Sequence, residues 1–137
     1  MRNVNDRTAV EIMEEPDEIE IFTEYVETES DPSVKVYEGE VNTNARSSFA
    51  SFDWIVYPNS LTRTAEIRLN KGEQIELLVQ NSSRKSFTAG IITPNGEKRY
   101  VKGTTSIRHT FSISQTGNYR VYVQNPGSTS ISVVGSY

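Results

Sequence analysis

The sequence predicts an all-β protein: a single antiparallel β-sandwich, jelly-roll-like, preceded by an acidic N-terminal extension. Apolar and polar residues alternate from Ser33 onward, which is the pattern of half-buried strands. Turn residues recur about every 8–12 residues along the same stretch, as in sandwiches and barrels. No segment repeats its apolar residues at the helical period of about 3.6 over the length of a helix. A closed barrel predicts almost the same sequence and stays open as an alternative.

Each expected strand is a short alternating segment. Residues 33–41 form the first, and residues 49–57 form the second. The second segment places Phe52, Trp54 and Val56 on one face of the strand. Further strands are expected at 65–69, 75–79, 87–91, 98–101, 107–113, 119–123 and 131–133.

Turn chemistry separates these segments. Asn70-Lys71-Gly72 predicts a hairpin that pairs residues 65–69 with residues 75–79. Pro94-Asn95-Gly96 predicts a second hairpin, between 87–91 and 98–101. The tripeptide Asn81-Ser82-Ser83 matches a glycosylation acceptor, but we interpret it as a turn.

Charge divides the chain into two parts. Residues 1–44 carry 13 acidic and three basic residues, whereas the remainder carries five acidic and 11 basic residues. We therefore expect an acidic, flexible N-terminal segment over residues 1–32 and the sandwich domain over residues 33–137. Residues 18–26 also alternate, so an edge strand that forms against the body or a partner is the alternative to a solvated leader.

The composition argues against catalysis and against cofactors. The chain has no cysteine, which excludes disulfides, thiolate zinc sites and a cysteine nucleophile. Its one histidine, His109, shares a strand face with Ile107 and Phe111, and we expect a backbone group to satisfy it. No nucleophile motif accompanies it, and no glycine-rich loop opens a helix. We predict no enzyme activity and no cofactor.

No metal site is expected either. A calcium loop needs spaced Asp, Asn and Gly residues, and the acidic leader lacks that spacing. The two acidic runs that come nearest are Asp17, Glu18 and Glu20, and Glu27, Glu29 and Asp31.

Two groups of residues form a candidate ligand or partner surface. Basic side chains on loops or an outer face would attract an anionic partner, although a solvated surface is the simpler interpretation. If they gather, the acidic leader is the nearest ligand and would mask them. Exposed aromatic rings would suit a sugar or a protein groove. The basic residues are Arg84, Lys85, Lys98, Arg99, Lys102, Arg108 and Arg120, and the aromatic residues are Tyr57, Tyr100 and Tyr122.

Location and partner follow from what the sequence lacks and presents. No apolar run reaches the roughly 20 residues of a membrane-spanning helix, and residues 1–12 lack the apolar stretch of a secretory signal. We expect an exported or cell-surface protein whose leader has been removed. The favoured function is protein contact, and the alternative is a carbohydrate or cell-wall module whose retention on polysaccharide depends on Tyr57 or Tyr122. No specific nucleic acid is expected, and the oligomeric state stays open.

Two segments carry a family resemblance. They are Leu69-Asn-Lys-Gly-Glu-Gln-Ile-Glu-Leu77, and Phe111 to Asn125, in which Gly117 and Tyr119 open a late strand. The stretch 64–134 resembles bacterial pre-peptidase C-terminal domains and, more distantly, Golgi-dynamics sandwich domains. The resemblance implies a jelly-roll accessory module, carried beside secreted enzymes or used in protein contacts, with no shared catalytic residues.

Overall fold

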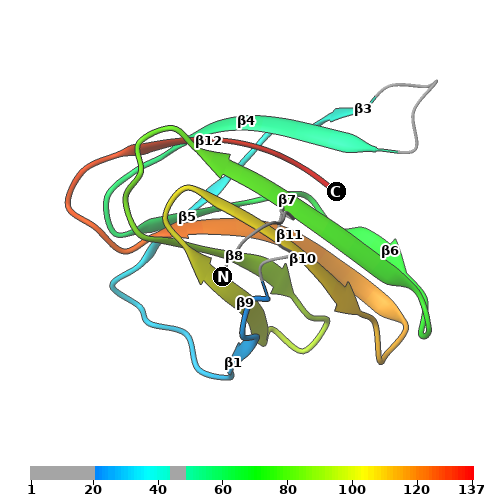
Figure 1. Cartoon of the computed structure of the whole chain (residues 1–137). Helices are drawn as coiled ribbons and strands as arrows, with labels where there is room; N and C mark the ends of the chain where they lie inside the picture. Colours follow the sequence, from blue (N-terminus) through cyan, green and yellow to red (C-terminus); the bar gives the residue numbers. More distant parts are fainter. Residues whose placement is uncertain (1–20, 44–48) are drawn as a thin grey trace, which may run out of the picture.

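The computed structural model describes residues 21–43 and 49–137, and the regular elements in those ranges are all strands. They form two facing sheets (Figure 1), so the predicted all-β sandwich is confirmed. In chain order the strands are β1 (Tyr25–Glu27), β2 (Lys35–Glu38), β3 (Asn42–Thr43), β4 (Ala50–Val56), β5 (Ser60–Arg63), β6 (Ile67–Leu69), β7 (Gln74–Asn81), β8 (Phe87–Ile92), β9 (Lys98–Gly103), β10 (Ser106–Ser112), β11 (Gly117–Asn125) and β12 (Ile131–Ser136).

The two sheets divide the strands unevenly. Sheet 1 has the order β1-β9-β8-β11-β5-β2, with β6 also paired to β11, and sheet 2 has the order β10-β7-β12-β4-β3. The described pairs are antiparallel except β2 with β5, which is parallel and departs from the predicted antiparallel pattern. Parallel neighbours need a crossover connection. Strands β3 and β4 of sheet 2 supply it, because they lie between β2 and β5 in the chain.

The core lies between the sheets and follows the predicted alternation. In β4, Phe52, Trp54 and Val56 are buried, and Ile55 on the opposite side of the strand is exposed. The Trp54 indole is half of a stacked pair with Phe52, and its Nε1 donates a hydrogen bond to the Glu40 carbonyl at 2.8 Å. The predicted core face of this strand is therefore confirmed.

One predicted hairpin is confirmed and the other is wrong. Strands β8 and β9 pair through the turn at Gly96, whose φ is +86°. Strand β6, in contrast, pairs with β11 in sheet 1, and β7 pairs with β10 and β12 in sheet 2. The turn at Gly72 joins the two sheets, and the Gly72 amide donates to the Ile113 carbonyl at 2.9 Å. Turn residues set a local reversal of the chain, but they do not choose the strand's partner.

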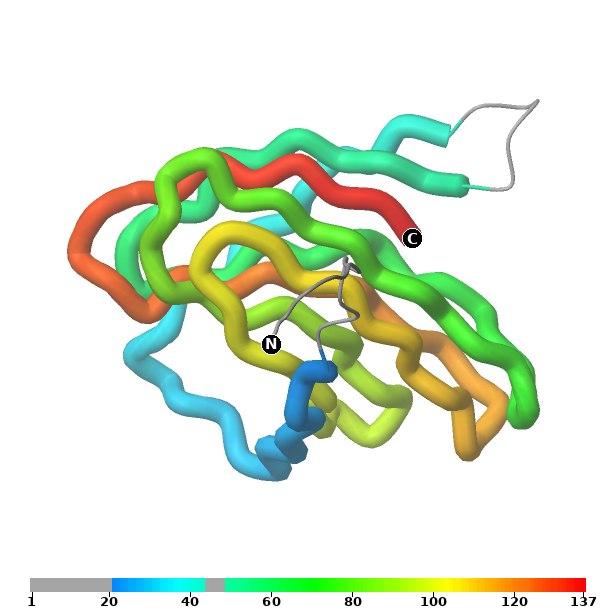
Figure 2. Tube along the Cα trace, in the orientation of Figure 1, coloured from blue at the N-terminus to red at the C-terminus, as the bar shows by residue number. Residues whose placement is uncertain are grey.

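The acidic segment contributes a strand. Residues 25–27 form β1 at the edge of sheet 1, so the edge-strand interpretation holds for them. Residues 28–34 then connect β1 to β2 at the opposite edge of the same sheet (Figure 2). The predicted leader residues 1–20, with Asp17, Glu18 and Glu20, lie outside the described residues.

Candidate partner-binding edge

Strand β9 presents two different faces. Its side chains alternate, so Lys98, Tyr100 and Lys102 lie on the outer face of sheet 1, while Arg99 and the buried Val101 face the sandwich interior. The predicted basic run is therefore split between two sides of one strand. We call β9 together with residues 24–27, which lie along it, the β9 edge.

Strand β1 lies antiparallel on this edge and matches its side chains. Tyr25 is opposite Tyr100, Val26 opposite Arg99, and Glu27 opposite Lys98. The rings of Tyr25 and Tyr100 stack with centroids 5.6 Å apart, and the Lys102 Nζ lies 4.7 Å from the Tyr25 ring centroid. Cross-strand pairs of this kind each contribute about 0.2–1 kcal/mol. The match is thus made by aromatic and charged groups as well as by the backbone.

Glu24 joins the two sheets at the start of β1. Its Oε2 lies 2.7 Å from the Arg99 Nε of sheet 1, and its Oε1 lies 3.0 Å from the His109 Nε2 of sheet 2. Burial alone would raise the pKa of Glu24, but hydrogen bonds from Arg99 and His109 together with their charges hold that pKa below its usual value of 4.5. The expectation that a backbone group satisfies His109 is wrong, because its partner is this carboxylate.

Arg99 is itself held in place. Its Nη1 donates to the Ser112 carbonyl at 2.8 Å, and its guanidinium lies 5.7 Å from the Phe111 ring centroid. A planar guanidinium fixed by such contacts loses little further freedom when it binds a carboxylate. The carboxylate site at the β9 edge is therefore preorganised.

Tyr122 is buried, which corrects its predicted exposure. Alternation does place it on the outer face of sheet 1, but long side chains cover it there, and only 1% of it is exposed. The Lys98 Nζ lies 5.7 Å from its ring centroid, and Gly90 beside it on β8 has no side chain. Burial is the main reason that the pKa of the Tyr122 phenol is raised, and the nearby Glu27 charge adds to the effect.

The other candidate residues lie elsewhere, so the predicted surface does not form one patch. Tyr57 is exposed beyond the end of β4 and meets Tyr37 edge to face at 5.2 Å between centroids. Arg108 lies on β10 in sheet 2 and pairs with Glu76 at 3.2 Å. Arg84 and Lys85 lie in the loop between β7 and β8.

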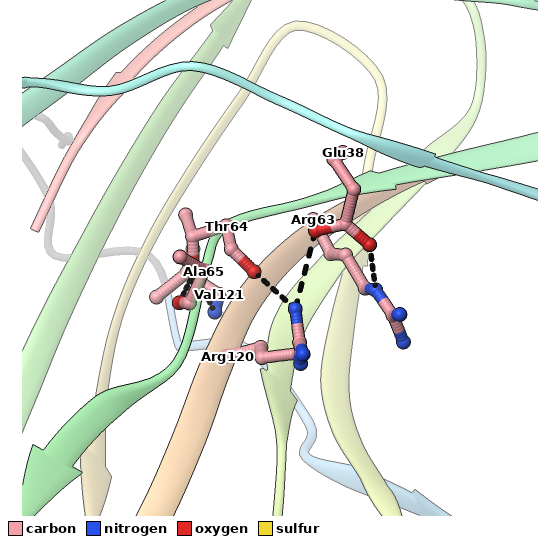
Figure 3. A network of polar contacts seen from close by, with 6 residues as sticks. All are labelled: Glu38, Arg63, Thr64, Ala65, Arg120 and Val121. Carbon is pink, nitrogen blue, oxygen red and sulfur yellow. Dashed lines mark hydrogen bonds and ion pairs between the residues drawn. The ribbon is translucent and has the colours of Figure 1, made fainter.

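Arg120 belongs to a network that fixes β2. Glu38 of β2 receives the Arg63 Nε at 2.8 Å and the Arg120 Nη1 at 3.2 Å, and Arg120 also donates to the Thr64 carbonyl at 2.9 Å (Figure 3). The hydrogen bond from Arg63 is the main reason that the pKa of Glu38 lies below its usual value. Arg120 therefore supports the edge opposite β1.

Glu24 and Tyr25 are the functional residues that the sequence candidates missed. The only signal for them is the alternation of residues 18–26, which also fits a solvated segment. Their partner Arg99 is among the sequence candidates. Charge complementarity between the acidic leader and the basic strand was visible, but the register between them was not.

The described residues contain neither a metal-binding cluster nor a membrane-spanning helix. No group of three His, Asp or Glu side chains in residues 21–43 and 49–137 is placed to hold a metal ion. In the same ranges, no helix is long and apolar enough to span a membrane.

Taken together, the fold and the site define a β-sandwich that carries an extended acidic segment on one sheet edge. No family model matches the chain, and no curated protein matches it. The resemblance to pre-peptidase C-terminal and Golgi-dynamics domains thus stays a prediction. Among solved structures, the chain is similar to Aeromonas hydrophila PliG, a periplasmic lysozyme inhibitor of g-type lysozyme. The two share 11% identity and a TM-score of 0.50, over 74% of this chain and 95% of that chain. This likeness supports the sandwich fold.

Proposed function

We propose that this chain is a non-catalytic, exported or surface-associated module that binds a partner protein by accepting an extended acidic segment as a strand along β9. The observation that carries the proposal is the docking of residues 24–27 on that edge, where Glu24 meets Arg99 and Tyr25 stacks on Tyr100. The chain's own segment thus shows the chemistry of the occupant: a carboxylate, then an aromatic ring, in extended conformation.

In strand addition, the backbone and the side chains of the edge play different parts. Backbone hydrogen bonds along a sheet edge give affinity for any extended segment, and side-chain pockets give specificity. Here Arg99 and His109 select a carboxylate, while Tyr100 and Lys102 select an aromatic ring. A segment with the same two groups in a partner protein would compete with β1 for this edge.

The short length of β1 makes such competition feasible. The strand has three residues, and two of its three side chains are more than a third exposed: Tyr25 at 40% and Val26 at 58%. It gains from covalent linkage, because a tethered segment acts at a high effective concentration. An incoming segment must exceed that advantage with more contacts than these three residues make.

The similar periplasmic inhibitor supports export and a non-catalytic role, since it pairs this sandwich fold with protein binding. The carbohydrate alternative now rests on Tyr57 with its neighbour Tyr37, because Tyr122 is buried. Retention on polysaccharide that is lost in Tyr57→Ala would favour it.

A labelled peptide tests the proposal. The peptide has the sequence of residues 20–31, and its binding to the full chain is followed by fluorescence anisotropy. We expect it to bind the variant Glu24→Gln/Tyr25→Ala at least about tenfold more tightly than it binds the wild type, because the variant releases the edge.

Two controls make the result specific. Adding Arg99→Ala to the released variant should abolish binding, and a peptide with Gln and Ala at the positions of Glu24 and Tyr25 should bind weakly. Equal binding to wild type and released variant, or binding that ignores both controls, would overturn the proposal. NMR signals of residues 25–27 confirm that the edge is released in the variant.

A further inference from the structure

A cavity lies beside the β9 edge and shares Lys102 with it. It has a volume of about 620 Å³ and is formed by the start of β8, the end of β9 and the turn into β10, with Phe22 on one side. Pockets of roughly 300–1,000 Å³ are typical of small-molecule sites. Its volume suits a ligand of the size of one or two sugar rings.

The cavity wall is built on a buried asparagine. The side-chain Nδ2 of Asn81 donates to the Lys85 carbonyl at 2.7 Å and to the Thr104 carbonyl at 3.1 Å. The backbone N–H of Asn81 donates to the Thr105 carbonyl at 2.8 Å. Only 3% of Asn81 is exposed. One residue therefore fixes both rims, the loop before β8 and the turn after β9. The tripeptide that resembles a glycosylation acceptor is a structural element instead.

Five hydroxyl groups line the cavity, and one of them, that of Thr88, is hydrogen-bonded to the buried Tyr122. Ser86, Thr104, Thr105 and Ser106 line it, and their hydroxyls make no hydrogen bond within residues 21–43 and 49–137. Other hydroxyls are used internally: that of Thr116, for example, accepts from the Lys71 amide at 2.9 Å. A cluster of free hydroxyls can both donate to and accept from a polyol.

Lys102 adds one positive charge to this lining. In the part of the chain that the structure describes, no carboxylate forms an ion pair with it, and its Nζ contacts only the Tyr25 ring face. An ammonium group with no acidic partner is a ready donor to a ligand carboxylate. Phe22 supplies an apolar surface for the carbon face of a sugar ring.

We propose that this cavity binds a sugar acid, a polyhydroxylated ring that carries one carboxylate. Lys102 pairs with the carboxylate, and the hydroxyls of Thr104, Thr105 and Ser106 bind the ring hydroxyls. The site shares Lys102 with the β9 edge, but its hydroxyls and Phe22 lie outside that edge, so sugar-acid binding does not require β9 to accept a partner.

The test is an NMR titration of the full chain with D-glucuronate, with D-glucose and acetate as matched probes. We expect D-glucuronate to shift the amide signals of Gly103 to Ser106 saturably, with an affinity at least about tenfold higher than that of either probe. Acetate shifting these signals with equal affinity would overturn the sugar part, and no saturable shift would overturn the site.

Matched variants locate the binding. Lys102→Gln should weaken D-glucuronate binding about tenfold, and Thr105→Val should weaken it without touching the contact to Tyr25. Lys35→Gln on β2 and Thr110→Val on β10, both exposed and away from the cavity, should leave it unchanged. An equal loss in a variant and its control would contradict the assignment. The peptide experiment uses other variants, so the two proposals fail independently.

Discussion

Glu24 contacts one basic residue of each sheet and therefore links the two sheets at the β9 edge. Its carboxylate is partly buried, with 28% of the side chain exposed, and both oxygens have a partner. Charged hydrogen bonds in such a setting contribute about 1–3 kcal/mol. Exposed pairs such as Arg108 with Glu76 contribute about 0–1 kcal/mol. The two ion pairs have similar geometry, but the Glu24 pair is less exposed and therefore contributes more to stability.

Acidic pH should weaken this Glu24 link between the sheets. Because the folded-state pKa of Glu24 lies below 4.5, its contribution to stability is present above about pH 4.5 and is lost as the pH falls through the lowered value. We expect Glu24→Gln to lower the free energy of unfolding by about 1–2 kcal/mol near pH 7 and by less at pH 3. Urea unfolding at both pH values measures this. Glu76→Gln is the matched control and should change stability little at either pH, whereas a pH-independent loss in Glu24→Gln would contradict the role of its charge.

At the scale of elements, the backbones of β8 and β9 lie so close at Gly90 that no side chain would fit there. A Cβ added at Gly90 would collide with the backbone of β9 at Arg99 and Tyr100. The absence of a side chain at Gly90 lets β8 pair with β9 in the observed register, and this pairing positions the β9 edge. The glycine is required by contact with a neighbouring backbone and not by a turn.

Gly90→Ala should therefore destabilise the protein strongly, by about 2 kcal/mol or more, since the backbone must shift. Thermal unfolding followed by circular dichroism measures the loss. Gly127→Ala is the matched control, because an added Cβ there meets only the Asn125 Oδ1 at 3.3 Å. Similar losses in the two variants would show that the strand contact is not the cause.

The sequence predicted some of the strands and turns and missed others. Alternation identified the buried face of β4, and the turn residues Pro94-Asn95-Gly96 identified the turn at Gly96, because both depend on neighbouring residues. It missed β5, whose residues Ser60–Arg63 are three polar residues and one leucine. The turn residues Asn70-Lys71-Gly72 also led to the pairing of β6 with β7, although those strands belong to different sheets. Pairing is decided by packing between distant segments, which a local pattern does not encode.

The candidate site was predictable to a similar extent. The basic strand residues Lys98, Arg99 and Lys102 were identified, but their split over two faces follows only from the position of β9 in the sheet. The burial of Tyr122 depends on long side chains from neighbouring strands, so alternation alone predicted its side of the sheet and not its exposure.

At the scale of the whole molecule, the acidic part of the chain contacts the basic part at one sheet edge. The acidic part supplies β1, and the basic part supplies β9, so opposite charges meet along the sheet edge. An uncovered edge strand invites pairing with other chains, and a short strand from the same chain covers it. Under the proposed function, β9 is a binding edge that the chain's own segment occupies.

The central claim is that β9 is a strand-accepting edge that residues 24–27 occupy. Amide hydrogen exchange of residues 98–102 tests it most directly, comparing the full chain with a truncation that begins at Ser33, with and without the peptide of residues 20–31. We predict slow exchange in the full chain, faster exchange in the truncated protein, and slow exchange again when the peptide is added. Exchange at β9 that is the same in both proteins, or that the peptide does not slow, would contradict the claim.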